Sequence, residues 1–275
     1  MHPFPSLLNA GATVVMATFA GGGAPVAIRL GASMLALQAS IGALNDLVDA
    51  GVDSGRKRGK PIPRGAVRPV EAGLVVAVGL IAGLGLSAVS GPATAAVAAV
   101  GVGLGYAYDL RLSRTAWSWL PLAAALPLVP IHAWIGATGA IPAPLQLLVP
   151  IGILAGGGLA LGNGIADLER DLAAGVTTAA IRLGQAAWPV HAAALLAVVV
   201  AAWLLAPGHV APGSIAAGSG AGIRAAAMAL ASGLVVLGLV LARARRPDVR
   251  ERGWELEAGG VALVALVWVS GITTA

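Results

Sequence analysis

Long apolar runs follow one another through this 275-residue sequence, and they constrain its fold more than any other feature. A helix needs about 20 mostly apolar residues to cross the hydrocarbon core of a bilayer. Runs of roughly that length lie at residues 5–22, 27–48, 70–90, 92–108, 116–137, 144–165, 186–206, 222–242 and 256–274. Only helices and closed β-barrels satisfy their backbone in lipid, and continuous apolar runs lack the alternation of a barrel. The sequence therefore predicts an all-α membrane protein with about nine transmembrane helices in a bundle.

The composition agrees with a membrane protein and excludes several kinds of chemistry. Hydrophobic residues make up 58% of the chain and charged residues 11%, whereas soluble domains carry about 25% charged residues. The alternative, a large buried core in a soluble protein, is disfavoured because much of a soluble surface must face water. The chain has no cysteine, which excludes disulfides, thiolate catalysis and cysteine-ligated zinc.

The charged residues predict the orientation of the helices. All but two of the 17 Lys and Arg residues, Arg29 and Arg224, lie in the loops after the second, fourth, sixth and eighth runs. By the positive-inside rule these loops and the N-terminus are cytoplasmic. All 12 Asp and Glu residues are assigned to helix ends or loops of the same face. We expect a multi-pass protein of the cytoplasmic (inner) membrane, without a cleavable signal peptide and without a nucleic-acid partner.

Two acidic segments end the second and sixth runs with the same spacing. In both, an Asn is followed by Asp at i+4 and i+8, which places the three side chains on one helical face. The segments contain Asn45, Asp46, Asp49 and Asp53 in the first half and Asn163, Asp167 and Asp171 in the second. The matched pattern indicates a weak internal repeat, at residues 45–53 and 163–171, within a single domain that spans residues 1–275.

Carboxylates at the ends of membrane helices are costly, so they are functional candidates by default. Magnesium is held by one or two carboxylates together with waters and substrate phosphates. Two such clusters therefore suit a diphosphate bridged by magnesium, which also stabilises charge on a departing diphosphate. In this interpretation Asp49, Asp53, Asp167 and Asp171 are catalytic, and all seven side chains of the two segments are metal ligands. The alternative is that both segments are hydrated helix ends paired with nearby basic residues.

Basic residues near the acidic segments are candidates for binding the diphosphate. They are Lys60, Arg64, Arg111, Arg114 and Arg182. Lys60 and Arg64 flank the stiff segment Pro61-Ile62-Pro63. The alternative is that these cations only set topology and contact lipid headgroups.

Both tyrosines of the chain, Tyr106 and Tyr108, lie at the end of the fourth run. A tyrosine ring face can stabilise a carbocation, but an interfacial aromatic belt is an equally good interpretation. The four histidines are interpreted as packing or interfacial residues.

At these positions the sequence resembles the UbiA superfamily of intramembrane prenyltransferases. Its Asn-Asp-x-x-Asp-x-x-x-Asp motif is matched by the first acidic segment, and its Asp-x-x-x-Asp motif by Asp167 and Asp171. Further similar positions are Lys60-Pro61-Ile62-Pro63 with Gly65, and Gly175, Thr178, Ala180 and Leu183-Gly184. Together with the helix count, the resemblance covers essentially the whole chain.

The resemblance implies two pseudo-repeats around a central cavity open to lipid, with a cytoplasmic cap of loops. It implies a magnesium-dependent enzyme that transfers a prenyl group from a polyprenyl diphosphate to an aromatic or lipid-like acceptor. Asn9 is similar to an Asn that the family often places near the acceptor. The expected partners are the prenyl diphosphate, a hydrophobic or aromatic acceptor and membrane lipids, with no obligatory protein partner.

The sequence departs from the family pattern at two positions. Ser113 and Thr177 stand where lysines are expected, although Arg114 is adjacent to the first. These changes favour a different arrangement around the diphosphate and leave the substrate open.

Three other functions are compatible with parts of the pattern. A terpene cyclase of the same superfamily ionises a prenyl diphosphate without an acceptor. A CDP-alcohol phosphotransferase is disfavoured because its Asp-Gly-x-x-Ala-Arg element is absent from both segments. A secondary transporter built from repeats is disfavoured because its charges would lie near the bilayer midplane.

Overall fold

A computed structural model describes residues 3–53, 61–206 and 219–272, and all regular structure in these ranges is helical. Eight helical segments are long and apolar enough to cross a membrane, and the shorter apolar helix Phe4–Phe19 precedes them. They correspond one by one to the nine predicted runs, which confirms the all-α membrane fold. The chain divides into two compact units, one of Met1–Ser113 with Leu128–Ala140 and one of Arg114–Pro127 with Ile141–Ala275.

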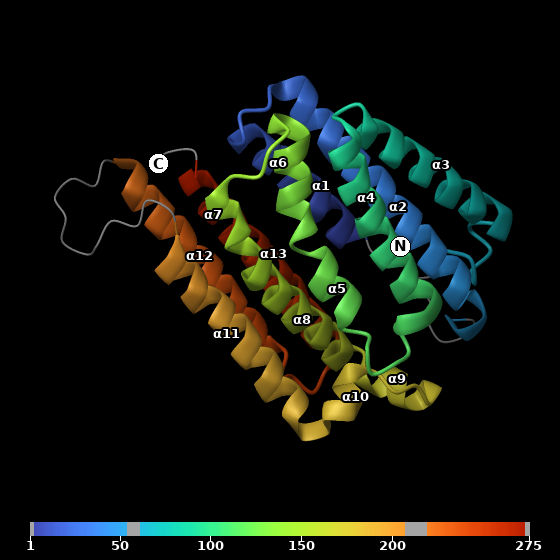
Figure 1. Cartoon of the computed structure of the whole chain (residues 1–275). Coiled ribbons are helices and arrows are strands. Elements are labelled where there is room, and N and C mark those ends of the chain that lie inside the picture. The colour runs from blue at the N-terminus through green and yellow to red at the C-terminus, as the bar shows by residue number, and fades with distance from the viewer. Residues whose placement is uncertain (1–2, 54–60, 207–218, 273–275) are drawn as a thin grey trace. The chain divides into compact units, whose positions relative to one another are not determined.

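The first unit contains helices α1 to α4, a π-helical turn and α6 (Figure 1). Their bounds are α1 Pro3–Phe19, α2 Ala24–Asp53, α3 Pro69–Ala88, α4 Pro92–Ala107, η1 Tyr108–Leu112 and α6 Leu128–Thr138. Proline at the first position starts both α3 and α4, where its missing N–H costs no hydrogen bond. The carboxylate of Glu71 accepts the main-chain N–H of Arg68 at 2.8 Å and so caps α3.

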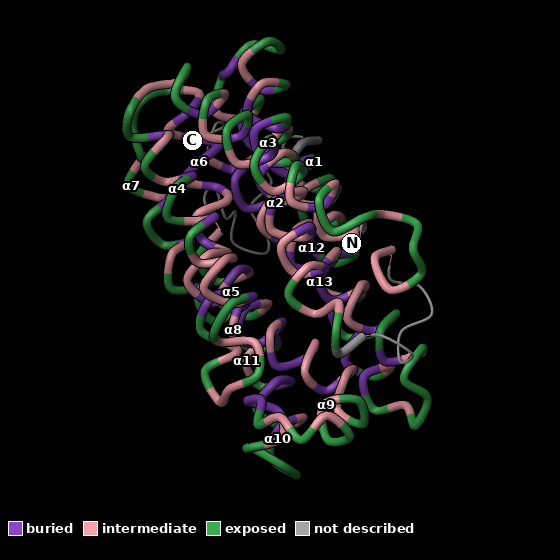
Figure 2. Tube along the Cα trace, turned by 90° about the vertical axis from the view of Figure 1, so that its right-hand side faces the viewer, coloured by how far each residue is buried: buried purple, intermediate pink, exposed green. Residues whose placement is uncertain are grey.

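Small residues hold α2 against α3 in this unit. A Cβ at Gly79 would lie 2.6 Å from the carbonyl oxygen of Ala36, so only glycine permits this approach. The hydroxyl of Ser33 donates to the Gly83 carbonyl at 2.7 Å, which is close backbone packing of the kind that membrane helices use. Outside this buried stripe, α3 exposes large apolar residues such as Ile81, and Figure 2 shows the exposed edge along the helix.

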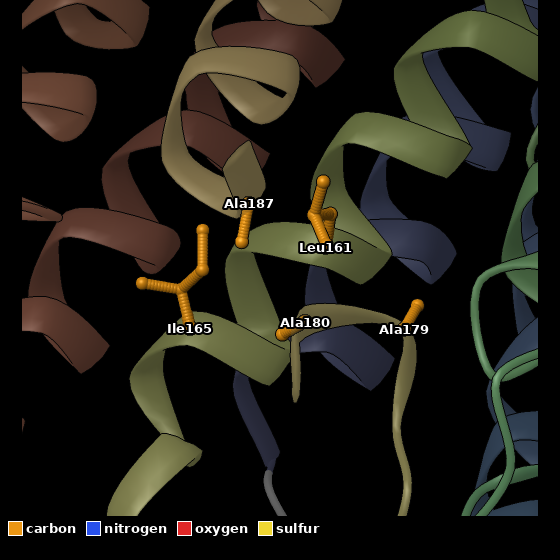
Figure 3. Packing of buried hydrophobic residues seen from close by; sticks show 5 residues of the cluster. All are labelled: Leu161, Ile165, Ala179, Ala180 and Ala187. Atoms are coloured by element: carbon orange, nitrogen blue, oxygen red, sulfur yellow. The ribbon is translucent and has the colours of Figure 1, made fainter. Parts of the chain in front are cut away.

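The second unit contains the remaining helices. Their bounds are α5 Leu120–Ala125, α7 Ala143–Gln146, α8 Leu148–Ala166, α9 Leu168–Ala174, α10 Ala179–Leu183, η2 Gly184–Ala186, α11 Ala187–Leu205, α12 Ser219–Leu241 and α13 Pro247–Ile272. Close approach again depends on glycine, because a Cβ at Gly253 of α13 would lie 2.9 Å from the carbonyl oxygen of Gly238 of α12. Leu161 and Ile165 of α8 pack with Ala180 of α10 and Ala187 of α11 in a buried cluster (Figure 3).

A buried acid inside α13 corrects one expectation from the sequence. Glu257 was assigned to a helix end, but α13 begins at Pro247 and the side chain is fully buried well inside the helix. Its Oε1 lies 3.1 Å from Nε2 of His191, whose Nδ1 lies 2.8 Å from the carbonyl oxygen of Gly158. A carbonyl only accepts, so Nδ1 donates, and one further proton is shared between His191 and Glu257. Helix α13 therefore includes the charged residues that precede the apolar run. His191 compensates the buried carboxylate of Glu257 inside this helix.

Candidate functional site

The first acidic segment occupies the last turns of α2, which runs without interruption to Asp53. Asp46 is only 4% exposed, while Asn45 and Asp49 are half-buried. The side chain of Asp53 lies outside the described residues. A continuous helix therefore carries this segment, as the i, i+4, i+8 spacing predicts, and its buried member is Asp46.

Asn45 has a partner that the sequence analysis did not assign to the site. Its Nδ2 donates to Oδ1 of Asp109 at 3.1 Å, and Asp109 is 5% exposed. Asp109 lies in the π-helical turn η1, where the amide of Ser113 bonds to the carbonyl of Tyr108 across five residues. Such a turn inserts an extra residue into a helix and is frequent at functional sites. The sequence does contain a signal for Asp109, because this acid directly follows the two tyrosines at the end of an apolar run. It was not assigned to the site from the sequence alone.

Tyr106 links three helices of the first unit. Its hydroxyl lies 2.6 Å from Oγ of Ser40, and that Oγ donates to the carbonyl of Val76 at 2.7 Å. Since the single hydroxyl hydrogen of Ser40 is used there, Tyr106 is the donor to Ser40. The ring packs against the buried cluster around Leu37 and Val102. Tyr106 thus has a packing role in the structure, and the carbocation role of Tyr106 and of half-buried Tyr108 stays a prediction.

The second acidic segment lies on two helices instead of one. Helix α8 ends at Ala166 and α9 begins at Leu168, with Asp167 between them at φ −93° and ψ 5°. The amide of Asp167 still bonds to the Asn163 carbonyl at 3.1 Å, and that of Asp171 to the Asp167 carbonyl at 3.0 Å. The i, i+4 links therefore persist on each side of an interruption that the spacing did not predict.

The carboxylates of the second segment have basic neighbours. Asp167 forms an ion pair with Arg170 one turn later. Glu169, which precedes Arg170, pairs with Arg250 from the first turn of α13. The sequence places Arg250 among the basic residues of a loop, but in the structure it is only 6% exposed. Arg250 thus reaches this segment from a distant part of the sequence.

The predicted diphosphate-binding cations that the structure describes lie at the surface. Arg64, Arg111, Arg114 and Arg182 are exposed, and Lys60 lies outside the described residues. Arg64 lies in a turn in which the carbonyl of Pro61 accepts the amides of Ala66 at 2.9 Å and Val67 at 3.3 Å. Arg182 lies in the last turn of α10.

Asn9, the predicted acceptor residue, is half-buried in α1. Its main-chain carbonyl accepts the hydroxyl of Thr13 at 2.8 Å. That contact uses the backbone alone, so it leaves the predicted role of the Asn9 side chain untested.

The chemistry of the two segments suits a hard cation. Carboxylate and amide oxygens are the donors that magnesium prefers, usually one or two per ion with waters and phosphates completing the shell. Among the residues with described side chains, no three His, Asp or Glu residues gather closely enough to hold a metal by themselves.

Comparisons with known proteins agree with this description. A model of the UbiA prenyltransferase family matches residues 7–252. A search of curated proteins finds no match. Among similar solved structures, a UbiA homolog from Aeropyrum pernix K1 is 18% identical with a TM-score of 0.72, over 98% of this chain and 96% of that one.

Two further structures have the same fold. One, of digeranylgeranylglyceryl phosphate synthase, is 15% identical with a TM-score of 0.69, over 99% of this chain and 94% of that one. A UbiA homolog from Archaeoglobus fulgidus bound to GPP and Mg2+ is 15% identical with a TM-score of 0.64, over 96% of both chains. Because the family model covers both acidic segments and most of the sequence, this multi-pass membrane protein belongs to the UbiA prenyltransferase family.

Proposed function

We propose that this protein is a magnesium-dependent intramembrane prenyltransferase that transfers a prenyl group from a polyprenyl diphosphate to an aromatic or lipid-like acceptor. The observation that carries the proposal is the pair of acidic segments at 45–53 and 163–171, both inside the region that matches the family. Relatives of the same fold, from Archaeoglobus fulgidus, are bound to GPP or DMAPP together with Mg2+. The charge distribution supports a site on the cytoplasmic side of the inner membrane, where the N-terminus also lies.

The acidic segments are proposed to bind the metal-diphosphate. Asp49, Asp53, Asp167 and Asp171 are the proposed catalytic ligands, and Asn45, Asp46 and Asn163 complete the donor set. Carboxylates alone would repel a diphosphate, so the ligand requires magnesium, which neutralises both and stabilises charge on the departing group. Lys60, Arg64, Arg111, Arg114 and Arg182 are proposed to contact the remaining phosphate oxygens, because ammonium and guanidinium groups form charge-assisted hydrogen bonds to phosphate.

The proposed reaction breaks the allylic C–O bond, and diphosphate leaves with the electron pair. The allylic cation then forms a bond to the acceptor, which loses one proton. Tyr106 and Tyr108 are the proposed aromatic neighbours of the cation, and Asn9 of the acceptor. The hydroxyl bond of Tyr106 to Ser40 supports a fixed ring, which a cation–π contact needs.

The experiment that tests this proposal measures diphosphate release by purified protein. Geranyl, farnesyl and geranylgeranyl diphosphates are supplied with and without magnesium, against a panel of aromatic and lipid alcohol acceptors. Release that requires both magnesium and one acceptor is the expected result. Magnesium-dependent release without acceptor, with a cyclic hydrocarbon as product, would instead identify a terpene cyclase. Substrate uptake into sealed vesicles without any release would favour a transporter.

A further inference from the structure

Arg250 is a buried cation in the second unit that the proposed reaction does not use. It lies in the first turn of α13, and its side chain is 7% exposed. A buried guanidinium is costly unless hydrogen-bonded acceptors surround it. The identity of those acceptors therefore indicates what this residue does.

The acceptors of Arg250 lie in one interhelical connection, at one helix end and in one short helix. Its Nη1 donates to the carbonyls of Ala244 at 3.2 Å and Arg245 at 3.3 Å, in the connection between α12 and α13. Its Nη2 donates to the Ala166 carbonyl at 3.4 Å and to the carboxylate of Glu169. Ala166 is the last residue of α8 and Glu169 belongs to α9, so one nitrogen bridges the interruption at Asp167.

Helix ends explain why a cation is suited to this place. The last carbonyls of α8 have no partner inside the helix, and a positive charge near a helix C-terminus is stabilising. The guanidinium is planar and presents its donors in a fixed fork, so it can hold a carbonyl and a carboxylate at once. In the neighbouring Asp167–Arg170 pair both side chains are partly exposed, at 32% and 44%, so solvent screens the attraction and the pair adds little stability.

We propose that Arg250 is a positioning residue for the second acidic segment. It holds the end of α8 and the start of α9 so that Asp167 and Asp171 keep their geometry toward a metal-diphosphate. This inference rests on the proposed function for its catalytic consequence. Its structural part, that Arg250 immobilises α9, is independent of any substrate.

The structural part is tested with a spin label. Because the chain lacks cysteine, Leu172→Cys places a single label on α9, where the native side chain is 58% exposed. Leu204→Cys places a reference label on α11, where the native side chain is 71% exposed. The labels are compared in the native background and in Arg250→Gln, Arg250→Lys and the control Arg246→Gln, whose exposed arginine pairs only locally with Asp248 at 2.6 Å.

We expect Arg250→Gln to increase the mobility of the label at 172 and to leave that at 204 unchanged. Arg250→Lys should restore part of the order, and Arg246→Gln should change neither label. An unchanged label at 172 in Arg250→Gln would overturn the proposal. Equal loosening of both labels would also overturn it, because Arg250 would then stabilise the whole unit and not this segment.

The catalytic part is tested by magnesium titration of prenyl transfer. Residues that orient metal ligands typically affect metal affinity or activity about 10- to 100-fold. Arg250→Gln should therefore raise the magnesium concentration for half-activation about tenfold and lower kcat, with KM for the acceptor changed less than about twofold. An unchanged magnesium dependence alongside a mobile α9 would overturn the catalytic role. If the native protein turns over no prenyl diphosphate, the proposed function fails while the spin-label result still decides the structural part.

Discussion

The two acidic segments have the same spacing in sequence but are built differently in the structure. The first lies on one uninterrupted helix, α2, and Asn45 is bonded to Asp109 from a π-helical turn. The second is divided at Asp167 between α8 and α9, and Arg250 bridges the division. The first segment has no such division, whereas the guanidinium of Arg250 spans the division of the second and bonds to a carbonyl at the end of α8. The same residue spacing can therefore be built with two different local supports.

The two units also differ in the buried polar contacts of their interiors. In the first unit, buried serine hydroxyls bond to one another and to a histidine, with Ser33 to Ser87 at 2.7 Å and Ser87 to His132 at 3.0 Å. In the second, a buried histidine and a buried carboxylate form a pair, His191 and Glu257. Loss of a hydroxyl removes one modest hydrogen bond, but loss of one member of a buried ionisable pair leaves an uncompensated group. We therefore expect the loss of Glu257 to cost more than the loss of Ser87.

The largest expected effect tests whether both segments serve one reaction. Asp49→Asn and Asp167→Asn should each lower kcat for prenyl transfer about 1,000-fold, roughly 4 kcal/mol, because each removes a charged oxygen that acts on the transition state. Asp248→Asn, at an exposed position, is the matched control and should stay near native activity. Diphosphate release at saturating magnesium measures the effect. Full activity of either motif variant would remove that segment from the proposed site.

The second prediction concerns the interiors. Glu257→Ala should lower the free energy of unfolding by about 3 kcal/mol, because it leaves His191 buried beside a cavity. Ser87→Ala in the first unit should cost about 1 kcal/mol. Both can be followed in detergent by the fluorescence of the seven tryptophans during thermal unfolding. Equal losses in the two variants would contradict the difference between the units.

A third prediction examines the support of the first segment. Asp109→Ala removes the acceptor of the Asn45 amide and should weaken magnesium activation about tenfold, a typical effect for a group that orients a ligand. The neighbouring exposed residue provides the control, since Arg111→Gln should not alter the magnesium dependence. If Arg111→Gln raises only the KM for the prenyl diphosphate, the proposed division between metal-orienting and diphosphate-binding residues is sharpened. An unaltered magnesium titration in Asp109→Ala would show that α2 needs no such support.

The smallest effects come from one kind of substitution, made within the first segment and just after the second. Gly51→Ala lies inside α2 with open space around the added methyl group, so it should stabilise the protein by up to about 1 kcal/mol. Gly175 ends α9 at a φ of +68°, where an alanine side chain is strained. Gly175→Ala should therefore destabilise the protein by about 1 kcal/mol. Thermal unfolding of the two variants should therefore shift in opposite directions. Shifts of the same sign would argue that α9 does not end as described.

Much of the fold was predictable because membrane spans are a local property. Within the described residues, the apolar runs were sufficient to locate the eight helices that are long enough to span a membrane and the shorter apolar helix Phe4–Phe19. The acidic segments were equally predictable, since a spacing of four residues places side chains on one face wherever the helix continues. The spacing failed only at Asp167, where main-chain bonds keep the periodicity and the helix is nevertheless divided.

The sequence by itself determined the number and character of the helices and the residues of the two acidic segments. Only the tertiary structure decided which groups support them. Asn45 meets Asp109 across 64 positions, Arg250 meets Glu169 across 81, and Glu257 meets His191 across 66. Hydrophobic periodicity is local and can be read directly, but the partner of a buried polar group depends on which helices pack together. That choice is made by close approaches of small residues, which leave no pattern in the sequence that identifies the pair.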